Sequence, residues 1–210
     1  MDLFEMVAAE RRALADVIEK LTDAQLQTPS LVPTWTVRDV AGHLALTLDL
    51  SVPKMLWTFL TTRSLMGTVD KMTWERAKHP VPELVATLRK FADSRKMPPG
   101  GSVEHLLTEQ VVHGLDLCKP LKIEHKLGED RLRPVLDMLF KTPARPYLKT
   151  AWRDGLRYEA TDLSWSHGEG PTLRGTTDLL ILAVTGRAAI LGELQGEGVD
   201  VLRQRYALPQ

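Results

Sequence analysis

The chain has 210 residues, and its 27 basic and 27 acidic side chains give a formal net charge of zero. This length fits one large domain, or a medium domain with a small companion. A composition of 43% hydrophobic and 26% charged residues is typical of a globular protein and argues against disorder. The balanced charge argues against nucleic acid as a partner, because no basic field attracts a polyanion.

Cys118 is the single cysteine, so an internal disulfide and a CxxC metal or redox site are excluded. The first residues, MDLFEMVAAERR, lack the apolar run of a signal peptide. The longest apolar run, Leu179 to Val184, is far shorter than the ~18 residues of a membrane span. We therefore expect a soluble, cytoplasmic protein without a membrane partner.

The first part of the chain is predicted to be helical. Apolar residues at helical spacing predict helices over 2–21 and from 37 into the fifties, where Pro53 ends or kinks the second one. Between them, Thr22 and Gln25 have the spacing of a capping box, which predicts a short turn over 23–28. The segment that follows, with Trp57, Phe59 and Trp74, reads as less regular.

Two further helices complete this part. Pro82 opens one whose apolar stripe includes Leu84 and Leu88, and Ser102 is a candidate N-cap for another over 103–118. Four substantial helices with short connections predict an up-and-down four-helix bundle, so the fold class is mainly α.

Composition changes near residue 150. All eleven lysines lie at or before Lys149, and eight of the fourteen glycines lie after it. Because prolines at 143 and 146 interrupt regular structure just before this change, we place a boundary at 142–150, between domains at 1–145 and 150–205. A helix over 130–141 links the two parts.

The second part mixes two periodicities. Apolar residues alternate over 156–160, which predicts a strand, and 172–174 is its expected partner across a turn at 168–171. An apolar helix is expected over 179–189, and a last strand over 199–202. These elements predict a small α+β domain.

A Glu–His pair lies on the helix predicted over 103–118. Glu109 and His113 are four residues apart, so their side chains project from one face within reach of a single ion. His43 lies midway along the helix that begins at 37, among apolar residues. Facing helices of a bundle build metal sites from inward side chains, and two histidines with one carboxylate leave zinc an open position for chemistry. In the alternative interpretation, Glu109 and His113 lie on a solvated helix face and His43 packs in the core.

Two segments around these residues resemble a known family. PTWTVRDVAGHL, residues 33–44, and EQVVHGLDL, residues 109–117, resemble the WTVxDVxxHL and ExxxHxxDL metal segments of the DinB/YfiT-like bundle enzymes. Residues 155–187 are similar to the small C-terminal domain of the mycothiol-dependent maleylpyruvate isomerase family. The resemblance covers most of the chain and is weakest over 53–100.

The resemblance implies a DinB-like bundle in which His43, Glu109 and His113 hold a divalent metal, usually zinc, with mycothiol as the thiol cosubstrate. It also implies a role in catalysis for an arginine of the small domain, which we match to Arg187; a surface arginine is the alternative reading. The second substrate is not fixed, because family members isomerise maleylpyruvate, transfer mycothiol to an electrophile, or have no assigned activity.

Elementary chemistry agrees with a thiol-using enzyme. A zinc ion held by two neutral histidines and one carboxylate retains a net positive charge, and a thiol that it coordinates loses its proton. Thiolate addition to a cis-enone acid, rotation about the new single bond and thiolate expulsion give the trans isomer, whereas an alkylating electrophile gives a conjugate. Cys118 lies about 140° around the helix from His113, so we expect it to pack in the core rather than act as the nucleophile.

Several alternatives remain at this point. His105, one turn before Glu109, could replace a histidine ligand, and Asp116 either orients an imidazole or is solvated. Trp57, Trp74 and Trp165 could line a pocket or pack in the core, Arg63 could contact substrate, and Trp35 is read as a packing residue before the second helix. A non-catalytic stress or regulatory metal protein and a structural dimerisation module are the competing functions. The expected partners are a small electrophile and a thiol, and the chain is a monomer or homodimer.

Overall fold

The structure is a computed structural model that describes residues 1–97, 101–141, 143 and 148–207. The chain divides into two compact units, Met1–His125 and Lys126–Gln210. The predicted boundary at 142–150 falls partly on residues outside the described ones, and the domain limits at 145 and 150 stay predictions. Each unit is described by itself.

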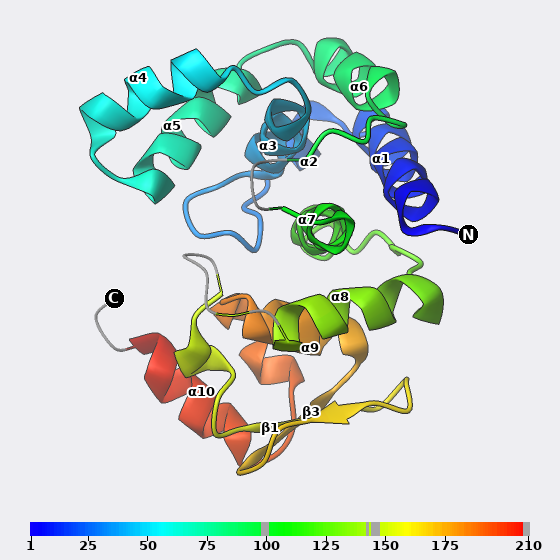
Figure 1. The fold of residues 1–210 in the computed structure, drawn as a ribbon, viewed down its shortest axis with the longest axis vertical. Coiled ribbons are helices and arrows are strands. Elements are labelled where there is room, and N and C mark those ends of the chain that lie inside the picture. Colours follow the sequence, from blue (N-terminus) through cyan, green and yellow to red (C-terminus); the bar gives the residue numbers. More distant parts are fainter. Residues whose placement is uncertain (98–100, 142, 144–147, 208–210) are drawn as a thin grey trace. The chain divides into compact units, whose positions relative to one another are not determined.

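Four helices of the first unit form a bundle (Figure 1). They are α1 (Leu3–Glu19), α3 (Val37–Asp49), α6 (Val81–Lys90) and α7 (Val103–Cys118). Both α1 and α3 pack against α6 and α7, so α1 and α3 lie diagonally in the ring. Their buried apolar side chains, among them Leu14, Val40, Leu84 and Leu117, form one core. The mainly helical fold with a four-helix bundle is confirmed.

The sequence signals at the ends of these helices act as predicted. Thr36 and Asp39 form a capping box at the start of α3, and the Ser102 hydroxyl accepts a hydrogen bond from the His105 backbone N–H at the start of α7. The short helix α2 (Asp23–Leu26) begins with the predicted Thr22–Gln25 capping box. These caps satisfy backbone N–H groups that have no partner within the helix.

The segment after α3 differs from the prediction. The second predicted helix ends at Asp49, and Pro53 lies in the first turn of a new helix, α4 (Val52–Thr62), which is followed by α5 (Leu65–Ala77). Proline suits a first helical turn because its missing N–H has no partner there in any case. The segment read as less regular is therefore helical. Its pattern was misleading because α4 turns most of its apolar side chains to solvent instead of into a core.

Helix α5 packs against α3 at very short range. A Cβ atom added to Gly42 of α3 would lie 2.8 Å from the Cα, Cβ and backbone N of Ala77, so a glycine is needed for this approach. The close contact brings the middle of α5 beside His43.

The second unit combines a small sheet with helices. Helix α8 (Glu129–Lys141) packs on α9 (Thr177–Val184), and the chain ends in α10 (Gly198–Ala207). The sheet has the strand order β2–β1–β3, formed by Ser166–His167, Arg157–Ala160 and Thr172–Gly175. The predicted α+β character is confirmed.

Three details of this unit correct the prediction. Strand β1 pairs in parallel with β3 in the register Tyr158–Leu173, because β2 takes the antiparallel place on the other side of β1. The apolar helix ends at Val184; Gly186 has φ +90°, and a 3-10 helix, η2 (Ala188–Glu193), follows. The segment predicted as a last strand is helix α10, in which Val199 and Leu202 are buried three residues apart. None of the helices in the described part of the chain is long and apolar enough to cross a membrane.

Candidate metal centre

His43 is supplied by α3 and held by α5. Its side chain is largely buried, and its Nδ1 atom lies 3.1 Å from the Thr73 hydroxyl oxygen of α5. A hydroxyl can donate or accept, so Thr73 suits either tautomer of the ring. This contact directs Nε2, the other ring nitrogen, towards α7.

Glu109 and His113 come from the neighbouring helix α7, one turn apart. The Nδ1 atom of His113 lies 2.9 Å from the carboxylate of Asp116, which is fully buried. A carboxylate accepts a hydrogen bond from Nδ1–H, and this tautomer has its lone pair on Nε2. Of the two interpretations of Asp116, the structure therefore supports the orienting one.

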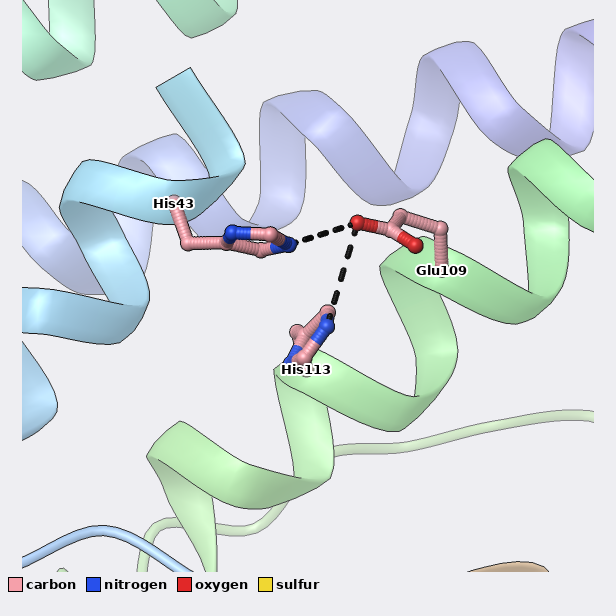
Figure 2. Close-up of side chains that lie close together, drawn as sticks. All are labelled: His43, Glu109 and His113. Carbon is pink, nitrogen blue, oxygen red and sulfur yellow. Dashed lines mark hydrogen bonds and ion pairs between the residues drawn. The ribbon is translucent and has the colours of Figure 1, made fainter. Parts of the chain in front are cut away.

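The three side chains meet at one point (Figure 2). Glu109 Oε1 lies 2.9 Å from His43 Nε2 and 3.8 Å from His113 Nε2, and one ligand atom from each residue lies within 4.8 Å of the others. Two imidazole nitrogens and a carboxylate oxygen are the donor set of catalytic zinc sites with an open position. The donor set therefore fits a divalent cation.

The protonation states also suit a cation. Burial alone would raise the pKa of Glu109, but the hydrogen bond with His43 and the nearby His113 and His43 rings lower it to about 2. Burial lowers the pKa of His43, against the opposing effect of Glu109. A carboxylate beside a neutral imidazole is thus the stable form at neutral pH, and both groups are in the state in which they bind a metal.

Trp35, immediately before the N-cap of α3, closes one side of the centre. Its ring centroid lies 4.9 Å from that of His43 and 6.1 Å from that of His113, and its indole N–H donates to Asp70 of α5. The sequence predicted only a packing residue here. The roles of Trp35 and Thr73 at the site depend on contacts between distant segments, and no local pattern shows them.

Other candidates lie elsewhere. Among the described residues, the three-residue metal cluster does not include His105, so its place as a substitute ligand is not supported. Trp57 and Trp74 are exposed and pack in no core. Arg63 is the exposed C-cap of α4. Trp165 is half-buried in the second unit, where it packs edge-on against Phe140.

Cys118 lies in the core of the bundle. Burial, together with the charge of Glu10, raises the pKa of its thiol to about 12, so it is uncharged at neutral pH. Because the thiolate is the reactive form, this agrees with the predicted packing role.

Arg187 belongs to the second unit, at the residue before η2. Its guanidinium donates to the Thr185 carbonyl oxygen at 2.6 Å. The predicted role of Arg187 in catalysis stays a prediction.

Comparison with known proteins shows what the chain is similar to. Residues 7–97 match the family model of the mycothiol maleylpyruvate isomerase N-terminal domain. Two similar solved structures are a mycothiol-dependent maleylpyruvate isomerase (TM-score 0.63) and a histidine-to-alanine mutant of it (TM-score 0.60). Each is 13% identical to this chain, with 94% of both chains covered, which shows a shared fold. No curated protein matches the chain significantly.

The family resemblance seen in the sequence is therefore confirmed. The matched segment contains most of α1 and all of α3 and α6, and with them His43, Thr73 and Trp35 of the candidate centre. Residues 7–97 of this chain are therefore similar to the mycothiol maleylpyruvate isomerase N-terminal domain.

Proposed function

We propose that this protein is a metal-dependent enzyme that uses a low-molecular-weight thiol, mycothiol, to isomerise a cis-enone acid of the maleylpyruvate type. In this proposal His43, Glu109 and His113 hold a divalent cation, and zinc is proposed because two imidazoles and a carboxylate are a donor set of catalytic zinc sites. The observation that supports it most strongly is the convergence of their three ligand atoms within 4.8 Å. The family match and the shared fold support the thiol and the reaction class.

A bound divalent cation would supply an acidifying centre that keeps a coordinated thiol in its nucleophilic thiolate form at neutral pH. The residues of the chain have the supporting roles. Asp116 and Thr73 orient the two imidazoles, Glu109 supplies one negative charge, and Trp35 shields the rings from water on one side. Cys118 takes no part, because its buried thiol stays protonated.

Arg187 has a separate role in the proposal, as a cationic group that faces the carboxylate of the substrate or thiol. A guanidinium binds carboxylates in a bidentate manner, which suits a dicarboxylic or keto-acid substrate. The localisation proposed from the sequence is the cytoplasm, where a free thiol cosubstrate stays reduced.

Metal content and turnover test the proposal together. Elemental analysis of the protein, purified after growth with added zinc, is expected to give one equivalent of a divalent metal, and His113→Ala is expected to lose it. His79→Ala is the matched control, since His79 is exposed and pairs with Glu83 away from the centre. NMR of maleylpyruvate with mycothiol is expected to show the trans isomer in a metal-dependent reaction.

Other results distinguish the competing functions. Accumulation of a stable mycothiol conjugate with no trans isomer identifies a thiol S-transferase. Bound metal without turnover of either kind identifies the non-catalytic, regulatory metal protein. Absence of metal from the wild-type protein contradicts the metal centre itself.

A further inference from the structure

Helix α4 exposes an unusual amount of apolar surface. It packs against α5 (Figure 1), and Thr58 is buried. Leu56, Trp57 and Leu60 are 58%, 70% and 67% exposed. Val52 and Phe59 are exposed as well. Scattered apolar residues are normal on a protein surface, but a continuous set on one short helix marks an interaction site.

The exposed residues share one side of the helix. Val52, Leu56, Phe59 and Leu60 have the spacing i, i+4, i+7 and i+8, which places them in one stripe. Thr58, which faces α5, lies well outside this stripe in angle. A stripe of this kind is the pattern with which one helix packs against another, and α4 uses a different face for α5. The stripe is therefore available to a further helix.

The charge and the area of this surface point to one kind of partner. Lys54 is the only charged residue in the sequence of α4, and its ammonium group is paired with Glu75 at 2.9 Å. With the exposed parts of Leu50, Leu65 and Met66 beside the helix ends, the surface amounts to roughly 800 Å², about what one partner contributes to a standard interface. Interface cores are poor in charge and rich in aromatic residues, and homodimer interfaces are more apolar than other interfaces.

We propose that α4 is a dimerisation surface on which a second copy of this chain packs its own α4 in antiparallel orientation about a twofold axis. Such an isologous contact needs a self-complementary surface, and the stripe provides one. Antiparallel pairing about the helix midpoint brings Leu56 against the partner's Phe59, and the partner's Leu56 against Phe59. Trp57, which flanks this contact, is the aromatic anchor.

The same features argue against a lipid membrane as the partner of the exposed face of α4. Helices that lie on membranes combine an apolar face with a strongly basic polar face that is attracted to anionic lipids. Lys54 is paired with Glu75, Arg63 at the C-cap is the one further cation at this helix, and the whole chain has no net charge. A second copy is thus the better match to an uncharged stripe. This inference is independent of the proposed function.

Sedimentation velocity of the full chain across a wide concentration series tests the proposal. The wild-type protein is expected to dimerise, and both Leu60→Glu and Trp57→Ala are expected to raise the dissociation constant by roughly thirtyfold or more, the loss typical of an interface anchor. Both side chains are largely exposed in the single chain, so we expect circular dichroism and the melting temperature to stay close to wild type. Met97→Glu, which changes an exposed apolar residue outside α4, is the matched control and is expected to leave the dimer intact.

Three outcomes would overturn the proposal. The first is a wild-type chain that stays monomeric at every concentration. The second is a dimer that Met97→Glu weakens as much as Leu60→Glu, which places the interface elsewhere. The third is a monomer that co-sediments with phosphatidylserine vesicles and loses this binding in Leu60→Glu, which identifies a lipid-binding surface instead.

Discussion

Asp116 offers the sharpest test of the proposed metal centre, because it contacts the proposed ligand His113 and is not itself one of the proposed ligands. Its carboxylate is fully buried and lies 2.9 Å from His113 Nδ1. Asp116→Ala removes the carboxylate that accepts the hydrogen bond from His113 Nδ1–H. Asp116→Asn keeps an acceptor oxygen of nearly the same shape but removes the charge. The two variants separate the effect of the hydrogen bond from that of the carboxylate charge.

The expected loss of zinc affinity follows from this contact. Groups that orient a metal ligand are typically worth ~10–100-fold in metal affinity, which corresponds to about 1.4–2.8 kcal/mol. A charge-assisted hydrogen bond of ~1.5–3 kcal/mol has the same magnitude. We therefore expect Asp116→Ala to weaken zinc binding within this range and Asp116→Asn to weaken it less. His113→Ala removes a donor atom outright and should cost more than either.

Competition with a chromogenic chelator measures the zinc affinity of each variant, and circular dichroism checks that each one is folded. Asp93→Ala is the control for loss of an acidic side chain, since Asp93 is exposed and pairs with Arg12 at the surface. Wild-type zinc affinity in folded Asp116→Ala would refute the orienting role. A loss as large as that of His113→Ala would also refute it, because Asp116 would then act as a ligand.

Three further predictions concern residues outside the ligand set. Cys118→Ser should leave turnover unchanged, and native Cys118 should resist alkylation near pH 8, because its pKa is about 12; loss of turnover in the folded, metal-loaded variant contradicts this. Arg187→Ala should lower kcat/KM by roughly tenfold to a hundredfold without changing metal content, as expected for a charge-assisted contact; an unchanged kcat/KM excludes the role. Gly42→Ala should lower the free energy of unfolding, measured by urea titration, by about 1–3 kcal/mol, because the added Cβ lies 2.8 Å from Ala77. This cost exceeds the gain in helix propensity from glycine to alanine. A more stable variant contradicts the tight contact between α3 and α5.

The sequence was most informative where local rules and tertiary packing agree. Helix α7 has the predicted bounds, because Ser102 caps its start and its apolar positions pack in the bundle. The same periodicity places Glu109 and His113 on one face, and the predicted bundle brings them to His43. The three proposed ligands could therefore be chosen without coordinates.

The sequence was misleading where side chains do not pack in the core of their own unit. Helix α4 exposes its apolar stripe, so periodicity gave no clear inner face. The four-residue segment from Val199 to Leu202 fits a buried strand or one turn of a helix, and only its packing in α10 decides between them. Strand β3 pairs with β1 as predicted, but in parallel, because β2 and not β3 forms the antiparallel neighbour that follows β1 in the chain.

The partners of the two imidazoles differ in kind, and this difference explains how the centre can be pre-formed. Asp116 is a carboxylate and accepts from His113 Nδ1, which fixes the Nε2 lone pair towards Glu109. Thr73 is a hydroxyl and permits either tautomer of His43. Without a cation, His43 can donate its Nε2–H to Glu109 while Thr73 donates to Nδ1, so that the partly buried carboxylate is stabilised. With a bound cation, the other tautomer would carry the proton on Nδ1 with Thr73 as the acceptor, and His43 Nε2 would be the atom that holds the ion.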